Sequence, residues 1–240
     1  MEEKLWKACG DGKVEGVRKL LQNSPINMNW QDPKYLMTPF CNACYEGHTE
    51  IVKLLSNEKR VDINKVQNDG ATPFLIACQQ GHIEIVKLLL NDNRVDINNG
   101  NKNDGSPFYI ACQQGHIEIV KLLLNDKRVD INKATNDNAT PFYIACQNGE
   151  IEILKYLLAC GREIDINKKF NNTKTPLDIS KERSTSLRQF DWETDEQYQK
   201  VRRNFPRIVE LIESFQRNPV DRREKLRKEL GLPGKFVFIS

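Results

Sequence analysis

The sequence has no long apolar run and little net charge. No window approaches the roughly 18 consecutive apolar residues that identify a membrane-spanning helix. The first residues, MEEKLWKACGDGK, carry acids at Glu2 and Glu3 and no apolar run, so we expect no secretory signal. The formal charge is only +3 in 240 residues, which gives no general reason to expect binding to a membrane or to nucleic acid.

Histidine is scarce, and no nucleotide-binding fingerprint occurs in the chain. The three histidines, His48, His82 and His116, all lie in copies of one repeated stretch, which leaves no separate histidine to serve as the base of a nucleophilic site. Paired carboxylates occur in DWETDE at 191–196, without a sign of the burial that would shift a pKa. We therefore expect no enzymatic activity, no catalytic residues and no cofactor.

The cysteine count is seven, an odd number. Without an expected secretory signal, an odd count favours free thiols in a reducing compartment. We expect a cytoplasmic, intracellular protein.

What the sequence does contain is a repeat. The stretch ACQQGHIEIVKLLL occurs without change at 77–90 and 111–124. A Thr or Ser followed by Pro opens each copy at intervals of 34, 34, 34 and 35 residues: Thr38, Thr72, Ser106, Thr140 and Thr175. A fixed period of this size predicts a stacked array in which each unit buries its apolar side on its neighbours.

The local chemistry predicts two helices and a loop in each unit. Thr72 and Pro73 suit the cap and first position of a helix, and Gly81 suits its left-handed end. A second helix, IEIVKLLL, follows, with Ile83, Val86 and Leu89/Leu90 on its expected apolar side. The polar stretch NDNRVDINNGNKNDG then predicts an extended hairpin.

This arrangement resembles the ankyrin repeat over about residues 5–180. The resemblance rests on TPFLIACQQGHIEIVKLLL…VDIN, which matches the family's T-P-L-H-x-A, G-H, apolar run and D-V-N. It implies a mainly α ankyrin-repeat solenoid, built of helix-turn-helix and β-hairpin or loop units, with a helical C-terminal extension. The family's histidine after T-P-L is replaced throughout, by Cys41, Leu75, Tyr109, Tyr143 and Asp178. Because that histidine normally ties neighbouring repeats together by hydrogen bonds, we expect this array to depend more on apolar packing.

The two ends depart from the regular pattern, and we expect six repeats counting both. The interval from the opening threonine to Ile-Val is 13 residues from Thr38 but 33 residues from Thr175 to Ile208. We interpret this as an insert before a short helix that begins at Pro206; the alternative is one continuous helix from Tyr198 to Phe215. The expected organisation is a capping repeat at 1–37, four regular repeats at 38–174, a degenerate repeat at 175–217 with an insert at about 184–205, and a helix and tail at 218–240.

The recurring cysteines and histidines have a structural interpretation. Cys9, Cys44, Cys78, Cys112 and Cys146 occupy one position of the first helix, and helices in a stack lie about 8–10 Å apart. Cysteines at that spacing cannot form disulfides or share a metal ion, so we expect a buried row of small residues and no metal site. The histidines mark the start of each second helix, and Glu150 continues their series. Cys41 lies outside the row and forms CNAC with Cys44, for which a redox role is the less favoured alternative.

The resemblance implies a non-enzymatic scaffold or adaptor that binds a protein on a concave surface made by hairpin tips and first helices. We expect an unidentified protein partner, no membrane or nucleic-acid partner, and a monomer. The candidate partner-binding residues at these positions are Trp30, Tyr35, Asn68, Asp69, Gln79, Gln80, Lys102, Asn103, Tyr109, Gln113, Gln114, Asn136, Asp137, Tyr143 and Gln147.

Two alternatives stay open at this stage. Tyr109 and Tyr143 either contact the partner or fill the space that the missing histidines leave. Residues 181–240 carry 14 Lys and Arg against 10 Asp and Glu. This basic extension either folds back as a cap or is itself the recognition element for an acidic partner or nucleic acid, with the repeats as a spacer.

Overall fold

The computed structural model describes residues 1–22, 25–185 and 195–233. The chain divides into two compact units, Met1–Ala111 and Cys112–Ser240, and the boundary falls within helix α7. The helices of the described residues, in chain order, are α1 (Glu2–Gly10), α2 (Val14–Gln22), α3 (Pro39–Glu46), α4 (Thr49–Ser56), α5 (Pro73–Gln80), α6 (Ile83–Leu90), α7 (Pro107–Gln114), α8 (Ile117–Leu124), α9 (Pro141–Gln147), α10 (Ile151–Ala159), α11 (Pro176–Thr185), α12 (Asp195–Arg217) and α13 (Pro219–Glu229).

The helix boundaries follow from the predicted caps. The Thr72 hydroxyl accepts a hydrogen bond from the Leu75 backbone N–H at 3.2 Å, and Pro73 occupies the first position of α5. The helix ends at Gly81, whose φ of 80° is left-handed. The second helix differs in one respect from the prediction, because Ile85 is fully buried in α6 whereas Ile83 is only half-buried.

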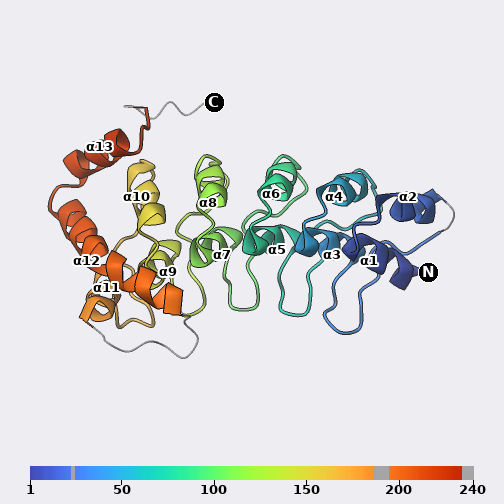
Figure 1. The fold of residues 1–240 in the computed structure, drawn as a ribbon, viewed down its shortest axis with the longest axis horizontal. Coiled ribbons are helices and arrows are strands. Elements are labelled where there is room, and N and C mark those ends of the chain that lie inside the picture. Colours follow the sequence, from blue (N-terminus) through green and yellow to red (C-terminus); the bar gives the residue numbers. More distant parts are fainter. Residues whose placement is uncertain (23–24, 186–194, 234–240) are drawn as a thin grey trace. The chain divides into compact units, whose positions relative to one another are not determined.

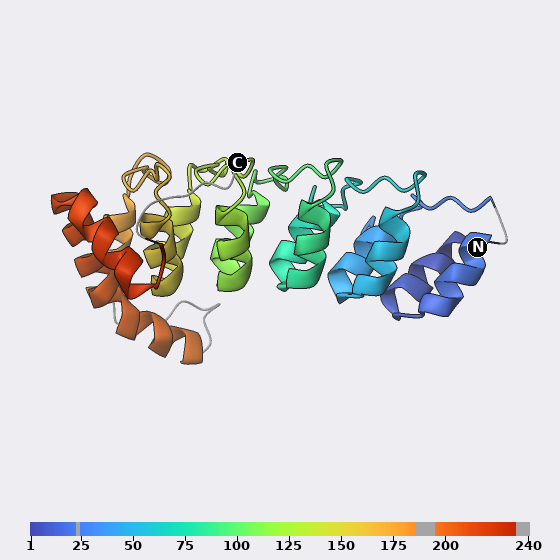
Figure 2. The same cartoon turned by 90° about the horizontal axis from the view of Figure 1, so that it is seen from above.

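In the first unit, the helices form two rows. The first helices α1, α3 and α5 pack in sequence, and the second helices α2, α4 and α6 pack beside them (Figure 1). Figure 2 shows the loops of this unit along one edge of the helix rows. The fold is therefore a mainly α repeat solenoid, as predicted. No strand forms within the described ranges, where a single isolated bridge joins Phe170 and Lys174, so the predicted hairpins are loops closed by turns.

The row of cysteines lies in the core. Cys9, Cys44 and Cys78 of the first unit are fully buried, as are Cys112 and Cys146 of the second. Burial raises the pKa of the Cys9 thiol to about 12, because the protein interior disfavours the charged thiolate. These cysteines are core residues in each repeat, as the sequence predicts.

In the second unit, α11 packs on α9, and α12 packs on both α11 and α10 (Figure 1). These are the contacts that the first and second helices of a repeat make with the preceding repeat, so we propose that α11 and α12 form a degenerate sixth repeat. Helices α1 and α2 lie within the expected capping repeat at 1–37, and α3 to α10 lie within the range 38–174 of the four expected regular repeats.

Helix α12 corrects one prediction. It runs without interruption through Pro206, so the expectation of a short helix that begins at this proline is wrong. The continuous-helix alternative describes the structure, although α12 begins at Asp195 rather than Tyr198. The Pro206 side chain is exposed, whereas Phe205 and Ile208 are buried against the preceding helices. Of the expected insert, residues 186–194 lie outside the described residues, as do 234–240 of the tail.

Candidate functional site

The loops that precede the first helices share one closed geometry. In the first unit a backbone hydrogen bond closes the turn from Gln67 to Ala71 and from Asn101 to Gly105. The first loop closes from Asp32 to Met37 and is one residue longer than these two. Each turn therefore projects a short tip beyond the first helices (Figure 1).

The tips are joined to one another by main-chain hydrogen bonds. The Asn68 N–H donates to the Tyr35 carbonyl at 3.0 Å, and the Lys102 N–H donates to the Asp69 carbonyl at 2.8 Å. In the second unit the Asn171 N–H donates to the Asp137 carbonyl at 2.8 Å. These bonds fix the spacing of adjacent tips, so each unit presents its tip side chains from an ordered backbone.

The predicted polar positions lie at the surface to different degrees. The tip side chains are exposed, as are two of the glutamines at the ends of the first helices: Asn68, Asp69, Gln80, Lys102, Asn103, Gln114, Asn136 and Asp137. Gln79, Gln113 and Gln147 are half-buried. The sequence pattern thus located a largely exposed polar surface within each unit.

The aromatic candidates divide into exposed and buried residues. Tyr35 is 43% exposed at the first tip, with the Lys34 ammonium 4.5 Å from the centre of its ring, and Trp30 is half-buried. Tyr109 and Tyr143 are only 8% and 2% exposed. The Tyr143 ring stacks on Phe170 with ring centres 5.1 Å apart. Both inner tyrosines are therefore buried, and the stacking of Tyr143 on Phe170 favours the space-filling alternative for that residue; a contact role in binding stays a prediction for both.

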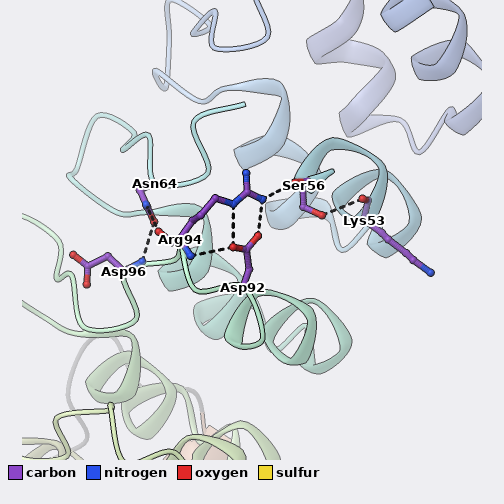
Figure 3. Close-up of polar contacts among 6 residues, drawn as sticks. All are labelled: Lys53, Ser56, Asn64, Asp92, Arg94 and Asp96. Atoms are coloured by element: carbon purple, nitrogen blue, oxygen red, sulfur yellow. Dashed lines mark hydrogen bonds and ion pairs between the residues drawn. The ribbon is translucent and has the colours of Figure 1, made fainter. Parts of the chain in front are cut away.

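Below the tips, asparagines of the VDIN motif connect successive loops (Figure 3). The Asn64 side-chain amide donates to the Arg94 carbonyl at 2.7 Å, and its oxygen accepts from the Asp96 N–H at 3.0 Å. Asn29, which lies in the sequence INMN at the equivalent position, makes the same bonds to Arg60 and Asp62 one repeat earlier. The sequence analysis did not predict a role for these asparagines. The repeated occurrence of the tripeptide DIN could have indicated one.

Arg94 adds a second connection in the same region (Figure 3). Its guanidinium donates to the Ser56 carbonyl at 2.6 Å and to both oxygens of Asp92. The side-chain hydrogen bonds from Arg94 lower the pKa of the Asp92 carboxyl, because they favour its charged form. The arginine is thus held between the ends of α4 and α6, where it links two repeats.

The histidines also connect repeats. The His48 Nε2 lies 2.8 Å from the Gly10 carbonyl, and the His82 Nε2 lies 2.9 Å from the Tyr45 carbonyl. In the second unit, amides make comparable bonds from Asn148 to the Gln113 carbonyl and from Asn204 to the Gly149 carbonyl. Side-chain hydrogen bonds between repeats are therefore present at the Gly-His positions, and a greater dependence on apolar packing stays a prediction.

The basic C-terminal extension uses two of its arginines internally. Arg227 is 6% exposed and donates to the Ala159 carbonyl at 2.9 Å, and Arg223 donates to the Leu158 carbonyl at 3.2 Å. Both carbonyls lie at the C-terminal end of α10, which attracts positive charge. Helix α13 therefore caps α10 within the second unit.

The described residues contain neither a candidate metal-binding cluster nor a candidate membrane-spanning helix. Among them, no three His, Cys, Asp or Glu side chains are grouped so that they could hold a metal ion. In the same residues no helix combines the length and apolar character needed to cross a membrane.

Comparison with known proteins places these features in a family. The family described as "Ankyrin repeats (3 copies)" matches residues 5–101 and 93–170, which together exceed half of the chain. No curated protein matched the sequence. With its repeated capped helix pairs and projecting loops, the chain belongs to the ankyrin-repeat family, whose repeats generally mediate protein–protein interaction.

Proposed function

We propose that this chain is a non-enzymatic binding module whose protein partner contacts the loop tips and the exposed ends of the first helices. The observation that carries the proposal is the main-chain bonding between tips, from Asn68 to Tyr35 and from Lys102 to Asp69. A surface already held in one arrangement loses little conformational entropy when a partner binds to it. The exposed amides and charges on this backbone supply hydrogen-bonding groups at regular spacing.

The basic extension is a weaker candidate for the recognition element. Arg223 and Arg227 bond to carbonyls of α10, and Phe205, Ile208 and Leu226 are buried. These contacts support an internal capping role. However, helix α12 also exposes three arginines, Arg202, Arg203 and Arg207. The experiment must therefore distinguish binding through these arginines from binding through the loop tips.

The experiment compares two triple variants of the full chain. In the tip variant, Asn68, Gln80 and Asn103 are changed to Ala; in the control variant, Asn57, Asn91 and Asn125 are changed to Ala. All six side chains are exposed amides, but the control residues lie in the loops that follow second helices. Each variant is used to capture partners from a lysate of the source cell, and a captured protein is then titrated at 50 and 300 mM salt.

We expect the tip variant to bind the partner at least about tenfold more weakly, while the control variant binds like the parent. The proposal is wrong if both variants lose binding equally, or if neither does. A steep fall of affinity with salt, together with equal binding by both variants, would place recognition on the basic extension instead.

A further inference from the structure

The first loop holds a leucine in a backbone conformation that leucine rarely adopts. Leu36 has a φ of 56°, and it stands two residues before the capping threonine. The corresponding residues of the next three loops are Gly70, Asp104 and Asn138, all with positive φ. Gly, Asn and Asp tolerate the left-handed region, whereas a bulky side chain there is strained. The turn therefore favours residues other than leucine at this position.

Leu36 is also exposed, which adds a second cost. Its side chain is 43% exposed, next to Tyr35 at 43%. Val66 of the second loop is 39% exposed. The Gln31 side-chain amide donates to the carbonyls of both Leu36 and Val66, at 2.6 and 2.9 Å, so the two segments adjoin. We call Tyr35, Leu36 and Val66 the first-loop patch.

The backbone under the patch is held firmly. Asp32 is 6% exposed, and its carboxylate accepts hydrogen bonds from the N–H groups of Lys34, Tyr35 and Met37 at 2.8–3.0 Å. The Leu36 N–H donates to the Asp32 carbonyl at 3.0 Å. The loop is thus closed around a buried carboxylate, and it presents Leu36 outward from a fixed frame. Strained residues that a surrounding structure holds in place tend to occur at sites of function.

The charge beside the patch indicates the chemistry of its partner. The exposed Lys34 ammonium lies over the Tyr35 ring, 4.5 Å from its centre, and the interaction with Tyr35 and the charge of Asp32 raise the pKa of Lys34. The patch therefore combines exposed apolar side chains with a neighbouring exposed cation. A protein segment that carries an aliphatic or aromatic side chain next to Asp or Glu would bury the first and pair with the second.

We propose that the first-loop patch is the specificity-determining anchor of this module, and that it binds an apolar side chain adjacent to a carboxylate in the partner protein. The proposal rests on the proposed function, because it names which part of the tip surface selects the partner. The regular loops then add polar contacts that vary little from one repeat to the next.

The test begins with a library of random 12-residue peptides displayed on phage, selected against the full chain. The enriched peptides are then titrated against Leu36→Asn, Val66→Ser and Lys34→Glu. Asn suits the left-handed turn, so Leu36→Asn removes the side chain without disturbing the loop. Val220→Ser is the matched control, because Val220 is an apolar residue that is 74% exposed on α13.

We expect enriched peptides to carry an apolar residue beside Asp or Glu. Leu36→Asn and Val66→Ser should each weaken their binding at least about tenfold, and Lys34→Glu should weaken binding of the acidic peptides most. Val220→Ser should bind like the parent. The melting temperature of Leu36→Asn should equal or exceed that of the parent, since the strain is relieved.

Other outcomes overturn the inference. A melting temperature of Leu36→Asn below that of the parent would show that the Leu36 side chain stabilises the fold, which would contradict its assignment as a binding residue. Peptides that keep their affinity for Leu36→Asn but lose it for the tip variant would remove the patch as anchor and leave the proposed function standing. Peptides unaffected by either variant would contradict both proposals. Failure to enrich any peptide would count against an anchor that recognises a short segment.

Discussion

At the scale of single residues, glycines and histidines of successive repeats depend on each other. Gly47 ends α3 with a φ of 83°, and a Cβ added there would lie 2.6 Å from the His82 ring. The same ring bonds to the Tyr45 carbonyl. The Gly-His motif thus combines a left-handed helix end in one repeat with room for the histidine of the next.

Gly47→Ala should therefore destabilise the fold by about 3 kcal/mol. About 1 kcal/mol comes from the left-handed backbone, and the rest from displacement of the His82 ring and its hydrogen bond. Gly231→Ala is the control, because Gly231 has a φ of 64° and nothing lies within 4 Å of its added Cβ. The control should cost only about 1 kcal/mol. Urea denaturation followed by circular dichroism measures both.

The same experiment in a His82→Ala background isolates the contact. Gly47→Ala should then cost only about 1 kcal/mol, because the ring that obstructs the new Cβ is absent. An undiminished cost in that background would show that the backbone conformation alone explains the effect.

At the scale of elements, α13 is attached to its unit by a buried arginine. Arg227 donates to the carbonyls of Ala159 and Pro233, and Leu226 beside it is fully buried. The Arg223 guanidinium lies 5.5 Å from the centre of the Phe215 ring of α12. Helix α13 thus contacts α10 and α12 through positive charge as well as apolar packing.

Arg227→Ala should destabilise the docked α13 by about 2–3 kcal/mol, because a charged donor is lost and the Ala159 carbonyl keeps a buried, unpaired acceptor. Hydrogen exchange should show faster exchange of the α13 amides, with those of α8 little changed. Lys225→Ala on the same helix removes an exposed charge and should change stability by less than about 0.5 kcal/mol. Equal effects of the two substitutions would contradict the capping role of Arg227.

At the scale of the whole molecule, seven buried thiols link stability to pH. Burial raises the pKa of Cys9 and of Cys41 to about 12, and it raises the pKa of the other five above the ordinary value. The folded chain therefore keeps its thiol protons at a pH where the unfolded chain releases them, near 8.5. The resulting stability is fully present below that pH and is lost as pH rises toward the folded pKa values.

We expect the free energy of unfolding to fall between pH 8 and 9.5, before lysine and tyrosine titrate. Each cysteine contributes a slope that approaches about 1.4 kcal/mol per pH unit above its unfolded pKa. Urea denaturation under reducing conditions at several pH values measures this slope. The Cys78→Ala variant should show a smaller slope, lower by the contribution of one cysteine. Stability that stays constant over this range would show that the thiols are not protected.

Much of the fold could be predicted from the sequence because its signals are local and recur. The same signals recur at a fixed period: a Thr-Pro or Ser-Pro at the start of each regular first helix, a glycine at its end and a cysteine within it. The structure predicted for one repeat therefore applies to the other regular repeats. The limits of α12 could not be predicted in this way. Pro206 suits either the first turn of a helix or an exposed position within one, and only the contacts of α12 with α10 and α11 select the second.

The candidate site was predicted less well than the fold, because exposure depends on neighbours that a single repeat does not specify. The sequence by itself determined the repeat period, the capped helix pairs and the polar loop tips, since these follow from residues close together in the chain. Only the tertiary structure decided that Tyr143 is buried against Phe170, that Arg227 faces inward, and that Leu36 stands exposed in a left-handed turn. Those outcomes depend on packing between repeats, where the available space and hydrogen-bond partners come from distant residues.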